Sequence, residues 1–352
     1  MFIRRVQATV SFIVAVFLLL LGTASPATAQ QNTYKWKMAI RDGGMLAEFP
    51  QIFADRLRAA SGGRIDITVY PAGTLGNALR VTETVSNGVA DVGFNWLAAD
   101  WGRNSAGVLV GGYPGGLTDV QMVHWLYEGG GAELVRQFRE QEFGIVSFVA
   151  GMTPAEVFLH SNKAIRTLAD FKGLKVRTAG AWIDMLKDLG AAPVSVPGAD
   201  VYPMLERGAI EATEWSTPAI NLAAGFHKIS RFVIVPGLHQ PASTWEVAFT
   251  KTTWDKLSPE DKRLIETTAK LTTYETWTRI GNADARAFQE FVKNGNTIVQ
   301  LDDSVRKEIA RLSTAWSEKQ ASQNPWFKRI YDSQKAFRAE WKDSGRFRDA
   351  GF

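Results

Sequence analysis

Hydrophobic and polar positions change period repeatedly along the chain, which predicts strands and helices in turn. Apolar residues at every second position, as in Ile65, Ile67 and Val69, indicate a strand. Apolar residues three or four positions apart, as in Phe49 and Phe53, indicate a helix. The first elements predicted in this way are a strand, a helix, a strand, a helix and a strand, over residues 35–40, 46–60, 64–70, 74–87 and 89–95.

A second unit repeats this alternation. Its predicted strands cover residues 144–150, 174–177, 193–196, 210–215 and 232–235, and its predicted helices cover 121–138, 182–189 and 199–207. Because strands joined through helices pair in parallel, we expect an α/β fold with a helix-covered parallel sheet in each of two lobes. Ligands of such sheets bind beyond the carboxyl ends of the strands, which makes Asn95 a candidate for the pocket wall.

The last third of the chain is predicted to be helical. Ser258 followed by Pro259 and two acidic residues is a strong helix start, and the pattern continues to residue 293. Such a length indicates either one strut that spans both lobes or two helices with a bend. A short strand at 298–301 and helices at 303–319 and 326–342 follow. The last helix has an apolar face that packs on its own lobe or on a second subunit.

The N-terminus reads as a targeting segment. Arg4 and Arg5 precede an apolar run over residues 10–21, and Ala27-Thr28-Ala29 forms a small-residue cleavage site. The run is too short for a membrane span, which needs about 20 residues. We therefore expect a signal peptide over residues 1–29, cleaved after Ala29, and a soluble periplasmic protein.

Composition narrows the classes of function. The net charge of +4 falls to +2 without the two signal-peptide arginines, which argues against nucleic-acid binding. The chain has no Cys, which excludes disulfides and thiolate chemistry. The chain has 12 Trp, which is a high number, and Trp is costly to place on an open surface, so some are expected to line a cavity. For any single Trp, ordinary core filling is the more common role.

Several segments resemble the DctP-type solute-binding proteins of TRAP (tripartite ATP-independent periplasmic) transporters. They are Ser61-Gly62-Gly63-Arg64, Tyr70-Pro71-Ala72-Gly73, Asp170-Phe171-Lys172-Gly173-Leu174-Lys175-Val176-Arg177 and Gly208-Ala209-Ile210-Glu211-Ala212-Thr213-Glu214. Three more segments are similar to the branch that binds 2-oxo acids such as pyruvate: residues 125–131, Glu214-Trp215 and Pro236-Gly237-Leu238-His239-Gln240-Pro241.

The resemblance implies a two-lobed fold of the type II periplasmic-binding-protein kind, with a long connecting helix. It places lobe 1 at residues 31–152 plus about 246–300, lobe 2 at 153–245, and C-terminal helices at 301–352. It also implies capture of a small organic anion in a closing cleft. Delivery to the small and large membrane subunits of a sodium-driven transporter would follow. Members of the branch can form homodimers by exchanging the last helix.

Arg177 is the first candidate for binding the ligand. It ends a predicted strand, and a guanidinium offers two parallel donors that match a carboxylate. An arbitrary Arg would more often form a surface ion pair, but the motif Arg of the family binds the ligand carboxylate. Weaker candidates for the pocket are Trp182, which follows the Arg177 strand, and Trp215 and Asn221, which follow Glu214.

In the 2-oxo-acid branch a metal ion, typically Na+, bridges protein oxygens and the ligand. The matching positions are Glu156, Glu214, Gln240 and the main-chain carbonyl of Trp215. Glu156 and Gln240 have exchanged the amide and the carboxylate that the branch usually has there, so the charge is unchanged. We expect Na+ or Ca2+ and no organic cofactor. The two Glu could instead accept hydrogen bonds from a hydroxylated or cationic ligand.

Other functions place different demands on the sequence. A secreted hydrolase is disfavoured, because none of the four His lies in a Gly-x-Ser-x-Gly or His-Glu-x-x-His setting. A periplasmic sensor domain would need the same site. An aromatic acid, a dicarboxylate or a sugar acid would satisfy Arg177 as well as a 2-oxo acid does.

Overall fold

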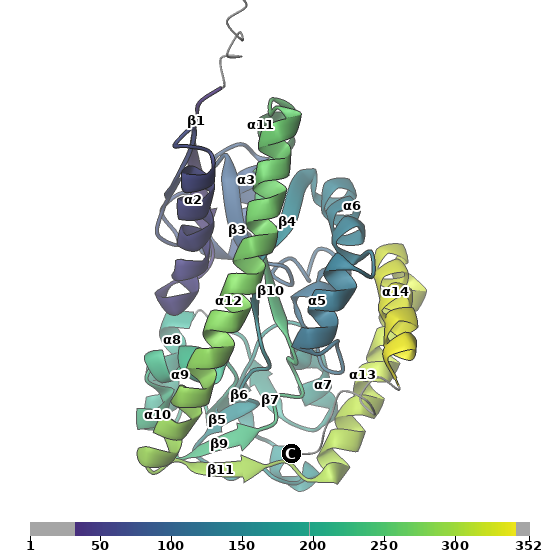
Figure 1. The fold of residues 1–352 in the computed structure, drawn as a ribbon. Coiled ribbons are helices and arrows are strands. Elements are labelled where there is room, and N and C mark those ends of the chain that lie inside the picture. The colour runs from purple at the N-terminus through teal and green to yellow at the C-terminus, as the bar shows by residue number, and fades with distance from the viewer. Residues whose placement is uncertain (1–31, 197, 343–352) are drawn as a thin grey trace, which may run out of the picture. The chain divides into compact units, whose positions relative to one another are not determined.

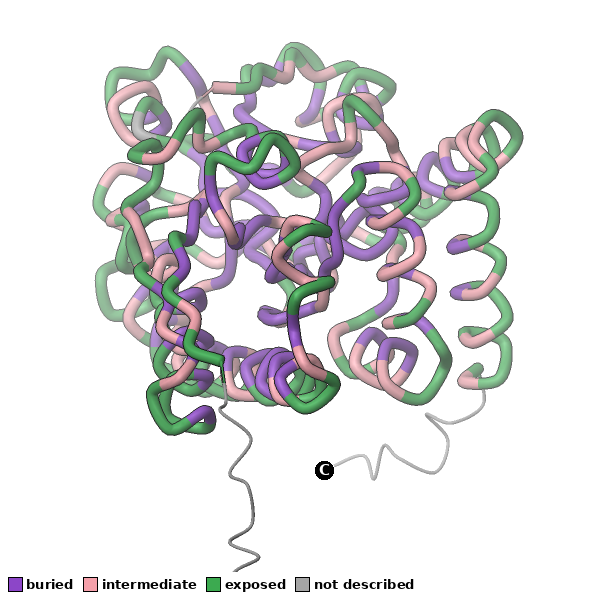
Figure 2. Tube along the Cα trace, turned by 90° about the horizontal axis from the view of Figure 1, so that it is seen from above, coloured by how far each residue is buried: buried purple, intermediate pink, exposed green. Residues whose placement is uncertain are grey.

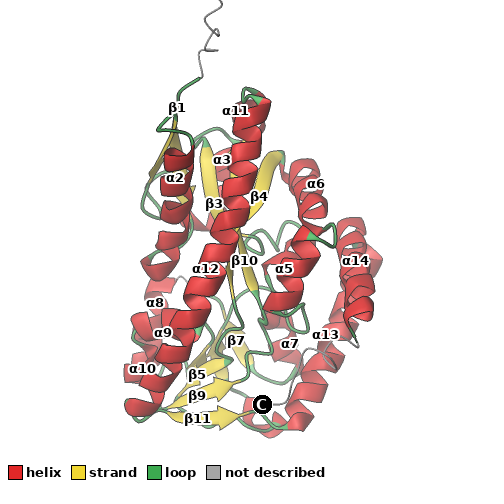
Figure 3. Cartoon of the chain, viewed as in Figure 1, coloured by secondary structure: helices red, strands yellow, loops and turns green. Residues whose placement is uncertain are grey.

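The computed structural model describes residues 32–196 and 198–342. Within them, two β-sheets flanked by helices form a mixed α/β fold (Figure 1, Figure 3). The signal peptide predicted for residues 1–29 lies outside this described part. No helix within it has both the length and the apolar character that crossing a bilayer demands.

The first sheet has five strands in the order β2-β1-β3-β10-β4. Their bounds are β1 Tyr34–Ile40, β2 Ile65–Val69, β3 Val92–Trp96, β4 Ile145–Thr153 and β10 Ser243–Thr250. Strands β1 and β3 are parallel, whereas β10 runs antiparallel to both β3 and β4. The expectation of a purely parallel sheet was therefore wrong. Strand β4 leads the chain out to the second sheet and β10 leads it back, and neighbouring strands that run out and back are antiparallel.

The second sheet has six strands in the order β11-β9-β5-β8-β6-β7. Their bounds are β5 Leu159–Ser161, β6 Lys175–Arg177, β7 Ala192–Val194, β8 Ala212–Thr213, β9 Phe232–Val235 and β11 Thr297–Gln300. Strand β6 pairs in parallel with β7 and β8, while β5 is antiparallel to β8 and β9. The carboxyl ends of β6 and β8 therefore meet at one edge, which brings together Arg177 and the residues after Thr213.

Short helices connect and cover the strands. Those before β5 are η1 Gly44–Ala47, α2 Glu48–Ala60, η2 Ala78–Arg80, α3 Val81–Ser86, η3 Ser105–Gly107, α4 Val108–Gly111, α5 Asp119–Tyr127 and α6 Gly131–Phe143. Those after it are η4 Leu168–Phe171, α7 Trp182–Asp188, α8 Gly198–Glu206, α9 Pro218–Ala223, α10 Phe226–Ile229 and α11 Lys251–Asp255. The helix predicted for 74–87 is shorter than expected, because Gly73 and Gly76 hold positive φ angles before it.

Helix α12, Pro259–Lys293, is one continuous helix of 35 residues, as the strut interpretation requires. The Ser258 hydroxyl caps it by accepting a hydrogen bond from the Asp261 N–H at 3.0 Å. The helix packs against β4 and α2 beside the first sheet and against α9 beside the second (Figure 1). It therefore contacts the surroundings of both sheets.

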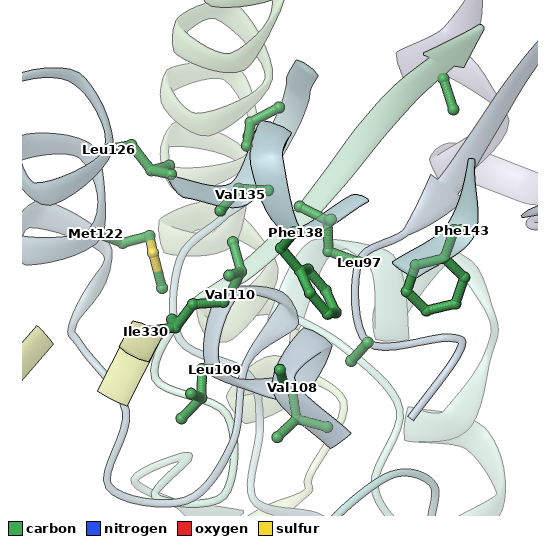
Figure 4. Close-up of a cluster of buried hydrophobic side chains, with 14 of the residues drawn as sticks. Leu97, Val108, Leu109, Val110, Met122, Leu126, Val135, Phe138, Phe143 and Ile330 are labelled. Atoms are coloured by element: carbon green, nitrogen blue, oxygen red, sulfur yellow. The ribbon is translucent and has the colours of Figure 1, made fainter. Parts of the chain in front are cut away.

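Two helices complete the described chain, α13 at Asp303–Gln323 and α14 at Pro325–Trp341. Phe327 and Ile330 of α14 are fully buried in the same apolar cluster as Leu109 of α4 and Phe138 of α6 (Figure 4). The Gln334 amide donates a hydrogen bond to the Leu109 carbonyl at 2.8 Å. The apolar face of the last helix thus packs on its own chain. Figure 2 shows buried positions inside the structure and exposed positions on the outer turns of the helices.

Candidate ligand- and metal-binding site

Arg177 lies at the carboxyl end of β6 with only 9% of its surface exposed. Its Nη1 donates to the Glu214 carbonyl at 3.2 Å and to Glu214 Oε1 at 3.1 Å. The guanidinium carbon lies 5.0 Å from the centre of the Trp215 ring, in a cation–π contact. Its Nε is buried without a partner in the described residues. The guanidinium is therefore held through one nitrogen and keeps donor capacity for another anion.

Three buried side chains surround a point next to Arg177. Glu214 follows β8, Glu156 lies between β4 and β5, and His239 lies between β9 and β10. His239 Nε2 is 3.3 Å from Glu156 Oε2 and 3.9 Å from Glu214 Oε2. One ligand atom from each of the three lies within 4.8 Å of the others, so the group can hold a metal ion.

Burial shifts the titration of all three groups. It raises the pKa of Glu156 well above its usual value and raises the pKa of Glu214, although Arg177 lowers both. It lowers the pKa of the His239 imidazole to about 4. In the absence of a ligand, the site therefore disfavours charge on each of these groups. A bound cation would reverse this preference for the two carboxylates.

Gln240 lies beside this group, but its amide nitrogen is engaged elsewhere. Its Nε2 donates to the Gly111 carbonyl at 3.1 Å and to Ser243 Oγ at 3.0 Å. The main-chain carbonyl of Gln240 accepts a hydrogen bond from the Glu156 N–H at 3.1 Å, which joins the two segments. The predicted role of Gln240 as a metal ligand stays a prediction.

Glycine is required in the segment that carries His239. A Cβ on Gly237 would collide with the Glu156 carbonyl. The close approach of these two backbones sets the imidazole opposite the Glu156 carboxylate. His239 is the member of the three that sequence reasoning did not assign to the metal, although it lies in the motif that signalled the branch.

Two indoles lie around the same point. Trp182 at the start of α7 is 2% exposed, and its ring lies 6.3 Å from that of His239 and 5.7 Å from that of Phe158. Its Nε1 is buried without a hydrogen-bond partner in the described residues. Trp215 covers Arg177 and is partly exposed. Both predicted pocket Trp therefore lie next to the charged groups.

The two predicted Asn lie in different places. Asn221 is fully buried on α9 and donates to the Ser216 carbonyl at 2.8 Å, so it supports the turn after Glu214. Asn95 donates to Thr82 Oγ1 at 3.1 Å. Thr82 belongs to another cluster, around the buried Arg139, so the structure does not bring Asn95 into contact with the groups around Arg177.

Asp284 is a nearby acid that the sequence did not single out. From α12 it accepts a hydrogen bond from the Ala219 N–H at 2.8 Å, at the start of α9. Burial raises its pKa to about 6, against the opposing effect of that hydrogen bond. Its charge in turn raises the pKa of Glu156. Asp284 thus joins the long helix to the turn that carries Glu214 and Trp215, and only the fold reveals it.

Comparison with known proteins identifies the family. Residues 45–324 match DctP, the bacterial extracellular solute-binding proteins of family 7. The chain belongs to this family. This family 7 protein is 28% identical over 308 residues to a monocarboxylate 2-oxoacid-binding periplasmic protein of Nostoc sp. strain PCC 7120. That match covers 87% of the chain and 84% of the relative. The resemblance to TRAP solute-binding proteins is confirmed.

Solved structures agree on the fold. A TRAP solute-binding protein from Bordetella bronchiseptica, described with calcium and picolinate, superposes on the family 7 protein with a TM-score of 0.86 at 24% identity. The match covers 91% of this chain and 96% of that one. One from Pseudoalteromonas atlantica, with sodium and pyruvate, has a TM-score of 0.82 at 25% identity and covers 90% and 98%. The two-lobed α/β fold class is confirmed.

Proposed function

We propose that this periplasmic solute-binding protein captures a 2-oxo acid such as pyruvate beside Arg177 and delivers it to a TRAP transporter. The single observation that carries the proposal is a buried guanidinium held through one nitrogen beside two carboxylates. The Nostoc relative is named for 2-oxoacid binding, and the Pseudoalteromonas structure contains pyruvate. No catalytic role is assigned, because the family consists of solute-binding proteins.

Arg177 would bind the carboxylate of the acid. The hydrogen bonds from Nη1 to Glu214 fix the plane of the guanidinium, and the Trp215 ring covers one of its faces. A carboxylate accepts paired hydrogen bonds from such a fork. Because the surroundings are buried, this pairing is stronger than it would be in water. The indole N–H of Trp182 is a further free donor near the ligand position.

A cation would bind beside the acid. The Bordetella structure contains calcium and the Pseudoalteromonas structure contains sodium. Here the carboxylates of Glu156 and Glu214 fit a cation, because their ligand atoms and that of His239 lie within 4.8 Å of one another. A bound cation would supply positive charge that also attracts the oxygens of the acid. The main-chain carbonyl of Trp215 and the amide oxygen of Gln240 remain proposed additional ligands.

We also propose the lobe boundaries and partners that the sequence implies. Lobe 1 is residues 31–152 with about 246–300, apart from β11, which pairs with β9 in the second sheet. Lobe 2 is residues 153–245, and the C-terminal segment is 301–352, of which the structure describes the part up to residue 342. Small and large membrane subunits would receive the ligand. A homodimer through the last helix would require α14 to leave Leu109 and Phe138 for a second copy. Light scattering of the purified protein decides between monomer and dimer.

Calorimetry with pyruvate tests the proposed function. Replacement of Arg177 by Lys keeps the charge but removes the fork, so affinity should fall at least about tenfold. Arg311→Lys is the matched control, because Arg311 pairs with Glu308 on the exposed surface of α13. Unchanged affinity in a folded Arg177→Lys variant would remove Arg177 from the site.

Other acids test the choice of ligand. An aromatic acid, a dicarboxylate or a sugar acid that raises the melting temperature more than pyruvate does would replace the 2-oxo acid but keep the transport role. A sensor role would be indicated if no genes for TRAP membrane subunits accompany this one.

A further inference from the structure

The most informative departure from an all-oxygen cation site is the imidazole between the two carboxylates. We propose that His239 Nε2 is a metal ligand together with Glu156 and Glu214, and that the position prefers a borderline divalent ion of the zinc type over sodium or calcium. The part of this inference that concerns pyruvate rests on the proposed function, whereas the choice of metal does not.

The three side chains converge from three separate segments of the chain. Glu156, Glu214 and His239 are 8%, 7% and 2% exposed, so none of them is a solvated surface group. Nε2 of His239 approaches both carboxylates, at 3.3 Å and 3.9 Å. The mutual spacing within 4.8 Å is that of ligands around one shared ion.

The imidazole is held in place by its neighbours. The ring of His239 packs 5.5 Å from that of Phe158 and 6.3 Å from that of Trp182. These contacts keep Nε2 on the side of the carboxylates. Its Nδ1 is buried without a hydrogen-bond partner in the described residues, so no neighbour fixes the tautomer. Nε2 can therefore present a proton to Glu156 or a lone pair to a metal ion.

The amide nitrogen of Gln240 has partners other than the two carboxylates. The amide nitrogen of Gln240 donates to the Gly111 carbonyl and to Ser243 Oγ, on the side of the first sheet. Two adjacent residues thus face different partners. The ring nitrogen Nε2 of His239, by contrast, lies 3.3 Å from Glu156 Oε2.

Ligand type and charge favour the same class of metal. Calcium and sodium are hard ions that bind oxygen, whereas an imidazole nitrogen suits zinc and neighbouring transition ions. Two carboxylates and the carboxylate of the acid carry three negative charges, and Arg177 supplies one positive charge. A divalent ion makes the buried group neutral, while a monovalent ion leaves one negative charge uncompensated.

The test uses the full mature protein after dialysis against a chelator. Calorimetry measures the affinities for Zn2+, Co2+, Ca2+ and Na+, first without and then with pyruvate. The visible absorption of Co2+ reports directly on its ligands. We expect Zn2+ and Co2+ to bind at least about tenfold more tightly than Ca2+, because only they gain from the nitrogen ligand.

The decisive variant is His239→Gln, which keeps a polar side chain but removes the ring nitrogen. It should weaken Zn2+ and Co2+ at least about tenfold, change the Co2+ spectrum, and leave Ca2+ within about threefold. The control is His124→Gln on α5, which accounts for zinc bound by imidazoles outside the site. Circular dichroism checks that each variant is folded.

Two outcomes would overturn the inference: tighter binding of Ca2+ or Na+ than of Zn2+ and Co2+ by the wild type, or unchanged Zn2+ affinity in His239→Gln. If pyruvate binds in the presence of Ca2+ or Na+ but not in the presence of Zn2+ or Co2+, the proposed function stands and only the zinc-type preference is rejected. No pyruvate binding with any of the four ions would reject the proposed function, and the metal-only titrations would still decide the role of His239.

Discussion

Two buried arginines in this protein have opposite surroundings. Arg139 on α6 is fully buried; its Nε and Nη2 donate to Glu246 at 2.9 and 2.5 Å, and its Nη2 also donates to Asp100 at 2.9 Å. Within the described part of the chain, Arg177 donates through Nη1 and to Glu214 only. The first arginine is paired with two acids through two of its nitrogens, and its Nη1 is buried without a partner in the described residues. The second is paired with one acid through one nitrogen, and its Nε is the buried donor without a partner there.

The acids differ in the same way. Glu246 accepts two hydrogen bonds from Arg139, so its charge is compensated within the fold. Over residues 32–196 and 198–342, Glu156 has no hydrogen bond to a guanidinium and instead faces His239. The acids of the Arg139 cluster are thus paired with a cation inside the fold, and we call this the complete cluster. Glu156 of the Arg177 cluster has no such bond among the described residues, and we call this the incomplete cluster. Neither burial of charge nor a single unused donor therefore marks a binding site, and a buried acid without a paired cation is the stronger sign.

The largest effect should come from breaking the complete cluster. Arg139→Met leaves Glu246 buried without its partner, so the free energy of unfolding should fall by about 3–5 kcal/mol. Urea denaturation followed by circular dichroism measures this loss. Arg311→Met on exposed α13 should leave the free energy of unfolding nearly unchanged, because solvent screens its pairing with Glu308. Equal losses in the two variants would contradict the distinction between the clusters.

Breaking the incomplete cluster should lower the free energy of unfolding less and should weaken pyruvate binding. Arg177 donates two hydrogen bonds, both to Glu214, whereas Arg139 donates four, so the loss of Arg177 leaves fewer buried acceptors unpaired. Arg177→Met should therefore lower the free energy of unfolding by about 2 kcal/mol or less, and weaken pyruvate at least about tenfold. The same denaturation series, with calorimetry, measures both. A stability loss as large as that of Arg139→Met would mean that Arg177 is structural.

Next to the incomplete cluster, Asp284 should make stability depend on pH. Burial raises its pKa from 3.8 to about 6, so between these values the native state holds a proton that the unfolded state releases. Its contribution to stability is therefore present near pH 4 and is lost as the pH rises to 6.

Asp284→Asn keeps an acceptor for the Ala219 N–H and removes the titration. Its free energy of unfolding should fall less over this range than that of the wild type, by about 1–2 kcal/mol. Denaturation midpoints at several pH values measure the difference. Glu308→Gln is the control, because Arg311 lowers the pKa of Glu308 and the slope should change in the opposite sense. Parallel pH profiles of wild type and Asp284→Asn would reject this account.

The smallest effect separates two buried indoles. Trp182 Nε1 has no partner in the described residues, whereas Trp125 Nε1 donates to Ser333 Oγ at 3.1 Å. Trp182→Phe should change the free energy of unfolding by less than about 0.5 kcal/mol and weaken pyruvate two- to fivefold. Trp125→Phe should cost about 1 kcal/mol and leave affinity unchanged. The reverse pattern would place the unused donor outside the site.

Periodicity and caps predicted much of the fold. The bounds of α12 follow from Ser258 and Pro259 at one end and Asn294-Gly295 at the other, because these signals are local. Strand β10 was missed as an element, and with it the antiparallel pairing of the first sheet. Its register depends on β3 and β4, which are distant in sequence, so no local pattern reports it.

The candidate site was predicted unevenly for the same reason. Arg177 and Glu214 end neighbouring parallel strands, so strand order alone predicts their approach. His239 comes from the irregular segment between β9 and β10, and Asp284 comes from the long helix α12. Their distances to Glu156 are set only by packing. Asn95 also ends a strand, but Thr82 takes its side chain into the Arg139 cluster.

The length of α12 has a consequence for how any motion of this protein can be observed. At 1.5 Å per residue its 35 residues extend about 50 Å, and Thr268, Thr272 and Thr276 return their hydroxyls to carbonyls four residues back in the same helix. The helix thus gives a fixed reference length inside the protein. Spectroscopic labels at its two ends should keep one separation with and without solute, so a change measured from either label to a distant strand reports displacement of that strand alone.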